Sequence, residues 1–387
     1  MKRVLAIALC AACSSTGGVG PGDAGETSEA SAEAAPDAPA DANLGEPITG
    51  LTPGTWTWVD FPGALCRDGT STGIGVSPSA SGDSTKLMIF LEGGGACFNA
   101  TTCGVNPAHF DAVTFAAQFL GVESNAGIFA RSDPKNAVAD WNMVYVPYCT
   151  GDVHAGNATD VTVPGVLGKQ QFVGYANVAQ YLSRIVPTFS NATRVLLTGH
   201  SAGGFGAALD FVQVSRAFGS VPVDLVDDSG PLMENPYLAA CLETEMSTLW
   251  GLSQTVIGQD CGSDCNDPGN DLALYWKHLP KTYPGSRFGF LDSTGDGVIT
   301  GFFGFGANDC TGYAPVGAAQ YEAGLLDMRS SVAADSNAGS FLFSGTDHTS
   351  LVLAYGTRTT PASDGGSVAL EDWVASLVGG SVTNVGP

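Results

Sequence analysis

An apolar run leads directly into the sequence Gly199-x-Ser201-x-Gly203, and a helix-forming stretch follows it. Residues 194–198 have the composition of a buried strand, and residues 204–217 have that of a helix. A strand that turns this sharply into a helix holds the central serine in a strained backbone conformation. The two glycines leave room for the turn because they carry no side chains. The segment therefore predicts a strand–turn–helix unit with the Ser201 hydroxyl at the carboxyl edge of a sheet.

Continuous apolar stretches alternate with helix-forming stretches along the chain, as expected for strands that are buried on both faces. After a leading hairpin at 56–60 and 73–77, the expected strands are residues 86–91, 141–148, 194–198, 221–226, 287–291 and 339–343. The expected helices are residues 175–185, 204–217, 272–278, 318–334 and 370–377. Strands that alternate with helices form a parallel sheet covered on both sides. Together with the serine turn, this order predicts an α/β-hydrolase fold, with a mostly parallel central sheet and helices on both faces.

A glycine run at residues 93–95 closes the expected strand 86–91. Acyl transfer needs N–H donors for the carbonyl oxygen as it becomes an anion, and glycines let the backbone approach a substrate with its N–H groups exposed. This fold takes one donor from the residue after the nucleophile and another from an earlier loop. We expect an oxyanion hole made by Gly94, Gly95 and Ala202. A phosphate-binding P-loop is excluded, since no Lys-Ser/Thr pair follows the glycines.

One of the five histidines, His348, follows the last expected strand before the C-terminal helix. The α/β-hydrolase fold places its general base in that loop, which gives the chain order Ser, Asp, His. We therefore predict His348 as the base. The other four histidines are expected to be structural or loop residues: His109, His154, His200 and His278.

The acid that orients the base is expected in the loop after strand 287–291. Asp296 follows the turn in that loop and is our preferred candidate, while Asp292, at the strand end, remains the alternative. The stretch resembles the start of a calcium loop, but Phe303 stands where a bidentate glutamate is required. The three predicted catalytic residues imply attack of Ser201 on an ester carbonyl, with His348 taking the proton and Asp296 orienting the imidazole.

These motifs, taken in chain order, resemble those of the pectin acetylesterases and the related Notum carboxylesterases. The matching segments are residues 91–98, 146–152, 199–204, 228–230, 290–296 and His348. The resemblance implies a Ser-Asp-His esterase without a cofactor and favours Asp296 as the acid. Two segments depart from the family pattern: Gly95-Ala96 stands where relatives often carry an aromatic residue, and the chain after His348 lacks the cysteine of plant members.

The leading hypothesis is hydrolysis of a short acyl ester, expected to be an acetyl ester, with an acetylated polysaccharide as the candidate substrate. A lipase or polyester depolymerase of the same fold is the alternative within this class. A surface binding module that has lost its chemistry is the alternative outside it. The net charge of −23 would repel a phosphate backbone, so nucleic acid is not an expected partner.

The N-terminus has the charged start and short apolar core of an export signal at residues 1–13. Cys13 resembles the lipid-modified cysteine of a bacterial lipoprotein, which predicts either membrane anchoring through Cys13 or simple secretion. Residues 14–48 are mostly small, polar or acidic, which predicts a disordered tether. Residues 49–387 are expected to form one catalytic domain.

Eight of the ten cysteines follow the N-terminal segment, an even number that suits disulfides in an exported chain. Two pairs are close enough in sequence to close small loops, Cys97 with Cys103 and Cys261 with Cys265. Zinc is not expected, because the second pair has no matching ligand pair and no nearby histidine. The sequence implies no metal.

Overall fold

A computed structural model describes residues 44–387. The predicted export segment, Cys13 and residues 14–43 of the predicted tether lie outside the described residues. At the start of the described chain, the Gly45 N–H donates to the Ser183 carbonyl at 2.9 Å, and the Ile48 N–H donates to the Thr188 hydroxyl at 2.7 Å. The packed chain therefore begins inside the segment that the sequence assigns to the tether, a few residues before the predicted boundary.

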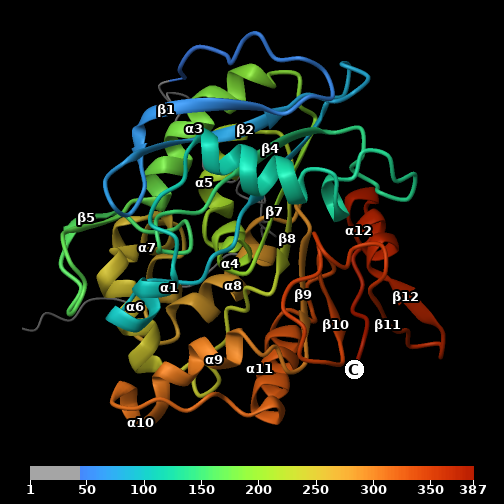
Figure 1. The fold of residues 1–387 in the computed structure, drawn as a ribbon. Helices are drawn as coiled ribbons and strands as arrows, with labels where there is room; N and C mark the ends of the chain where they lie inside the picture. Colours follow the sequence, from blue (N-terminus) through green and yellow to red (C-terminus); the bar gives the residue numbers. More distant parts are fainter. Residues whose placement is uncertain (1–43) are drawn as a thin grey trace, which may run out of the picture. The chain divides into compact units, whose positions relative to one another are not determined.

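An eight-stranded sheet forms the centre of the described chain, in the order β1-β2-β4-β3-β7-β8-β9-β10 (Figure 1). The first two strands pair antiparallel with each other, and β2 pairs antiparallel with β4, whereas the strands from β4 to β10 run parallel. The strands of this sheet are β1 Thr57–Leu65, β2 Ser71–Ser77, β3 Lys86–Leu91, β4 Asn142–Val146, β7 Arg194–His200, β8 Val223–Asp228, β9 Phe288–Ser293 and β10 Ala338–Phe343. Two small hairpins lie outside it: β5 Ala158–Val161 with β6 Gln170–Phe172, and β11 Thr359–Pro361 with β12 Ser367–Ala369. The predicted hairpin and mostly parallel sheet are confirmed.

Alternate strand residues enter two separate apolar cores, one on each face of the sheet. In β3, for example, Leu87 and Ile89 pack in one core, whereas Met88 and Phe90 pack in the other. The first core receives buried side chains from helices α3 (Gly174–Thr188), α5 (Phe211–Phe218), α8 (Asp271–Thr282) and α11 (Ala318–Ser331). The second receives them from η1 (Phe115–Glu123) and α12 (Leu370–Gly379). Because both faces of the sheet are buried, the strand sequences are continuous apolar runs.

The helices follow the predicted order, with several additions. They are α1 Ala100–Val105, α2 Ala112–Thr114, α3 Gly174–Thr188, α4 Ala202–Leu209, α5 Phe211–Phe218, α6 Ala240–Trp250, α7 Val256–Asp260, α8 Asp271–Thr282, α9 Ile299–Phe303, α10 Ala307–Cys310, α11 Ala318–Ser331 and α12 Leu370–Gly379. The shorter π and 3₁₀ segments are η1 Phe115–Glu123, η2 Gly127–Phe129, η3 Leu252–Gln254, η4 Gly262–Cys265 and η5 Gly304–Gly306. The prediction of one helix over 204–217 is wrong, since a break at Asp210 divides it into α4 and α5. The sequence also missed α6, which matters for the site.

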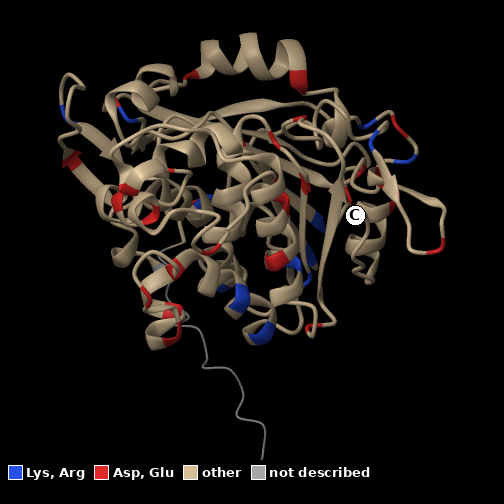
Figure 2. Cartoon of the chain, turned by 90° about the horizontal axis from the view of Figure 1, so that it is seen from below, with Lys and Arg blue, Asp and Glu red and all other residues tan. Residues whose placement is uncertain are grey.

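Four disulfides cross-link the described chain. They join Cys66 to Cys149, Cys97 to Cys103, Cys241 to Cys310 and Cys261 to Cys265. The two short loops are the pairs that the sequence suggested. None of the helices within residues 44–387 combines the length and the apolar composition that a membrane-crossing helix needs. Figure 2 shows Asp and Glu spread over many helices and loops of the chain, which carries a net charge of −23.

Candidate active site

The turn between β7 and α4 holds Ser201 in a left-handed backbone conformation, with φ 56° and ψ −122°. A side chain on Gly199 or Gly203 would collide with backbone oxygen atoms, so both positions require glycine. The Ser201 N–H donates to the carbonyl of Asp228 at 2.7 Å, which fixes the turn against the end of β8. The strain and the close packing are those of a nucleophile turn, and Ser201 lies where the sequence predicts it.

His348 and Asp296 form a hydrogen-bonded pair at the same edge of the sheet. The imidazole Nδ1 lies 2.7 Å from Asp296 Oδ2. Asp296 Oδ1 accepts the N–H groups of Val298 at 2.8 Å and Ile299 at 2.9 Å, so three donors surround this buried carboxylate. Because a carboxylate only accepts hydrogen bonds, Nδ1 carries the proton of the neutral ring, and Nε2 is left to accept one.

Asp292, the alternative acid, has other partners. Its Oδ2 accepts the hydroxyl of Tyr321 at 2.5 Å, and its Oδ1 accepts the Ser293 N–H at 2.7 Å. Burial, and then the nearby charge of Asp296, raises the pKa of Asp292 well above its ordinary value. The structure therefore pairs His348 with Asp296, whereas Asp292 is bonded to Tyr321 and Ser293.

Asp228 joins the Ser201 turn to the loop that carries His348. Its backbone carbonyl accepts the Ser201 N–H, and its carboxylate Oδ2 accepts the N–H groups of Ser350 and Leu351, both at 2.7 Å. Those two residues closely follow His348, so Ser201 and His348 are both anchored to one residue. No hydrogen bond joins the Ser201 hydroxyl to the His348 ring among the described residues. Such bonds are often long in substrate-free enzymes and shorten on binding.

The glycine loop after β3 lies next to Ser201. A side chain on Gly93 would approach Ser201 Cβ within 2.9 Å. None of the hydrogen bonds within residues 44–387 uses the N–H group of Gly94 or Gly95, and Gly95 has a left-handed φ of 78°. Ala202 is the first residue of α4, and the first N–H groups of a helix have no partner inside it. The three predicted oxyanion donors are therefore unpaired N–H groups near Ser201.

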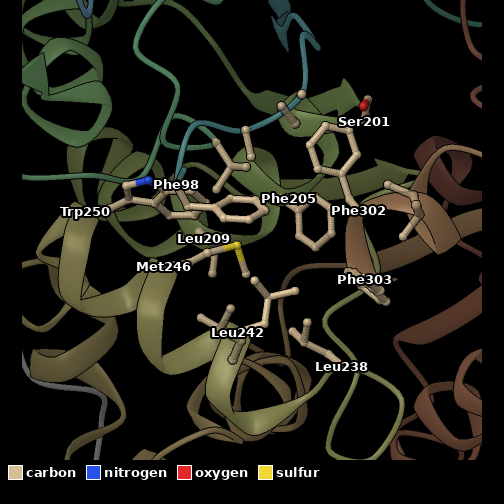
Figure 3. A pocket seen from close by; sticks show the side chains of 16 residues that line it. Phe98, Ser201, Phe205, Leu209, Leu238, Leu242, Met246, Trp250, Phe302 and Phe303 are labelled. Carbon is tan, nitrogen blue, oxygen red and sulfur yellow. The ribbon is translucent and has the colours of Figure 1, made fainter. Parts of the chain in front are cut away.

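An apolar pocket opens at Ser201. Its lining consists of Gly95, Ala96, Phe98, Val153, Ser201, Ala202, Phe205, Leu209, Leu238, Leu242, Met246, Trp250, Leu272, Ile299, Phe302 and Phe303. Figure 3 shows the Ser201 hydroxyl at one end, with Met246, Leu242 and Trp250 of α6 further in. The Trp250 indole N–H is bonded to the Cys97 carbonyl at 3.0 Å. Among the described residues that line this pocket, the Ser201 hydroxyl is therefore the one side-chain N–H or O–H group that makes no hydrogen bond.

The other four histidines occupy structural or loop positions, as the sequence predicted. His200 packs edge-on against Phe90, and burial lowers its pKa to about 4. His278 Nε2 contacts Asp260 at 3.0 Å, and His109 lies exposed beside two aspartates. His154 is a buried loop residue, and its Nε2 donates to the carbonyl of Glu92 at 2.8 Å. No group of three or more His, Cys, Asp or Glu side chains within residues 44–387 could hold a metal ion.

Glu92, at the start of the glycine loop, is a buried acid. Its carboxylate accepts the Tyr148 N–H at 2.8 Å, and burial raises its pKa to about 8. A carboxyl group whose pKa is raised in the folded state stabilises the protein fully below its unfolded pKa of about 4.3. That contribution is lost as the pH rises through 8.

Glu92→Gln should therefore change the pH dependence of stability. A glutamine oxygen can still accept the Tyr148 N–H, but it never ionises. From pH 5 to pH 8 the wild type should lose stability relative to Glu92→Gln by about 2 kcal/mol or more, or roughly 5 °C in melting temperature. Thermal unfolding followed at several pH values measures the difference. Glu46→Gln, at an exposed position, controls for the lost charge, and a Glu92→Gln difference that stays constant with pH would contradict the account.

The fold and the site together define a class of protein. A mostly parallel sheet, a serine on the turn between β7 and α4, and a histidine–aspartate pair at the same sheet edge are the features of an α/β-hydrolase. The predicted fold class is confirmed.

The sequence pattern of the pectinacetylesterase family matches residues 56–267, more than half of the chain. The chain belongs to the pectinacetylesterase family, a family of carboxylic ester hydrolases. Its motifs had indicated this family, and that prediction is confirmed.

Curated relatives and solved structures agree with the family. The chain is 32% identical over 160 residues to the palmitoleoyl-protein carboxylesterase NOTUM of Schmidtea mediterranea, covering 39% of this chain and 28% of the relative. It is 27% identical over 178 residues to the human NOTUM enzyme, covering 44% and 34%. The chain thus spans about a third of the length of these relatives. The Drosophila Wnt deacylase Notum shares the fold, with a TM-score of 0.56 and 18% identity, covering 85% of this chain and 95% of that one.

Proposed function

We propose that this protein is a serine esterase that hydrolyses acyl esters through Ser201, His348 and Asp296. The observation that carries the proposal is the hydrogen bond between His348 and Asp296 at the sheet edge where the strained Ser201 turn lies. Unpaired N–H groups beside Ser201 and an apolar pocket that opens at its hydroxyl add support. The relatives are named as carboxylesterases, which supports the proposal of an esterase.

In the proposed reaction, the Ser201 oxygen attacks the ester carbonyl while His348 Nε2 takes the hydroxyl proton. The carbonyl oxygen becomes an anion, which the N–H groups of Gly94, Gly95 and Ala202 stabilise. The imidazolium then gives its proton to the departing alcohol, and an acyl-serine remains. Water attacks this ester by the same route, releasing the acid and restoring Ser201. Asp296 holds the imidazole in the required tautomer throughout and stabilises its charged form.

The acyl group is expected to enter the pocket beyond Ser201. An acetyl group would contact only the mouth, whereas the side chains from α6 and α9 line a space suited to a longer aliphatic chain. Relatives named as palmitoleoyl-protein carboxylesterases support a long acyl chain as well. We therefore propose an acyl chain longer than the acetyl group that the sequence suggested, which brings the function closer to the lipase alternative.

A series of p-nitrophenyl esters from acetate to decanoate tests this proposal. We expect kcat/KM to rise from acetate to about octanoate. Met246→Trp, which fills the inner pocket, should lower kcat/KM for octanoate by at least roughly tenfold and leave acetate nearly unchanged. Leu249→Trp is the matched control, because Leu249 lies on the same helix but does not line this pocket. If kcat/KM of the wild type fell steeply for chains longer than butyrate, the protein would be an acetylesterase instead.

We keep the other expectations as proposals. A polysaccharide as the carrier of the ester, export, and anchoring through Cys13 rest on the sequence, and the last two concern residues outside the described range. The disulfides are consistent with an oxidising compartment. The inactive binding module is disfavoured, because His348 is hydrogen-bonded to Asp296 at the sheet edge where the strained Ser201 turn lies.

A further inference from the structure

The amide side chain of Asn106 contacts the glycine loop from behind. Asn106 is buried at the C-terminal end of α1, and its Nδ2 donates to the carbonyl oxygen of Gly94 at 2.8 Å. Sequence reasoning did not single out this residue. The hydrogen bond to Gly94 matters because it holds the peptide group between Gly94 and Gly95.

The Gly94 carbonyl and the Gly95 N–H belong to one peptide group. The sole cis peptide bond of the described chain joins Asn235 to Pro236, so this peptide is trans and planar. In a trans peptide the C=O and N–H bonds point in opposite directions. A donor that holds the Gly94 oxygen therefore turns the Gly95 N–H away from Asn106. Gly95 also lines the pocket that contains Ser201.

Asn106 is itself held firmly. The guanidinium of Arg67, a buried side chain, donates from Nη2 to the backbone carbonyls of Asn106 and Cys103, both at 3.0 Å. Arg67 Nη1 also donates to Gln170 at 2.6 Å. The disulfide between Cys97 and Cys103 joins α1 to the end of the glycine loop. These contacts give the amide a defined position from which to orient the loop.

We propose that Asn106 is a positioning residue for the oxyanion hole: its amide N–H orients the Gly94–Gly95 peptide so that the Gly95 N–H meets the developing oxyanion. The inference rests on the proposed function and deepens it. Electrostatic stabilisation of this kind depends on donors that are already in place before the reaction. Losing the Asn106 donor leaves Gly95 present but free to rotate, so the transition state loses more than the bound substrate does.

Asn106→Ala and Asn106→Asp test the proposal, since neither an alanine nor an ionised aspartate can donate to the Gly94 oxygen. We expect kcat for p-nitrophenyl butyrate to fall roughly 10- to 100-fold in both variants, with KM changed less than about threefold. The affinity for n-butylboronic acid, which forms a tetrahedral adduct on the serine, should fall by a similar factor.

Asn142→Ala is the matched control. Asn142 is also a buried asparagine whose Nδ2 donates to backbone carbonyls, those of Ser84 at 2.8 Å and Lys86 at 3.1 Å, but at the opposite end of β3. It should lower the melting temperature as Asn106→Ala does, while kcat and boronic acid affinity stay near the wild-type values. Asn106 variants whose kcat and boronic acid affinity stay as close to the wild-type values as those of Asn142→Ala would overturn the positioning role. A wild type that hydrolyses no ester would instead overturn the proposed function.

Discussion

Ser201→Ala is expected to lower kcat/KM for p-nitrophenyl esters by roughly 10⁵- to 10⁶-fold. The reason is that the proposed reaction passes through a covalent bond to the Ser201 oxygen, for which an alanine has no substitute. The small remaining rate would come from the oxyanion donors and from binding alone. Steady-state hydrolysis with high enzyme concentrations measures the loss.

Ser286→Ala serves as the control for the loss of a buried serine. Ser286 lies just before β9, at the amino end of that strand, and is 5% exposed. It should keep nearly full activity, and Ser201→Ala should unfold at the wild-type temperature. An alanine variant at Ser201 that keeps more than about 1% of the activity would exclude this residue as the nucleophile.

Asp296→Asn should have the second largest effect, a fall in kcat of about 10⁴-fold. An asparagine can present its N–H₂ group to His348 Nδ1, which would place the ring proton on Nε2, where the base must accept. Hydrolysis rates at pH 8 measure the effect.

Asp292→Asn is the matched comparison, because both aspartates are buried at the carboxyl end of β9. An asparagine can still accept the Tyr321 hydroxyl as Asp292 does. We expect less than about a tenfold loss in this variant. Equal losses in the two variants, or a larger loss at Asp292, would reverse the assignment of the acid.

The sequence predicted the parts of the site that follow from local pattern. Ser201 was recognisable because two glycines and a strand–helix junction surround it. His348 and Asp296 were found because each follows an apolar strand, and the carboxyl ends of parallel strands meet at one sheet edge. The choice between Asp296 and Asp292 depended on the turn after β9, where only the coordinates show which carboxylate reaches the ring.

The parts that the sequence missed depend on contacts between distant segments. Asn106 and His154 reach the glycine loop only after the chain folds, across 12 and 62 residues. The pairing of Cys66 with Cys149 spans 83 residues, and no local signal selects it. Helix α6 did carry a signal, since Leu242, Met246 and Trp250 recur at helical spacing and point into the pocket. Recognising it would have indicated a deep acyl pocket from the sequence.

Labelling with a fluorophosphonate, followed by peptide mapping, tests the central claim most directly. The reagent phosphonylates a serine only where a base activates it and an oxyanion hole receives the phosphoryl oxygen. Trypsin should release residues 195–216, and fragmentation separates Ser201 from Ser215 within that peptide. We predict one adduct per chain, on Ser201, formed in parallel with the loss of ester hydrolysis. Hydrolysis that persists in the fully treated protein, or an adduct on any other residue, would contradict the assignment of Ser201 as the nucleophile.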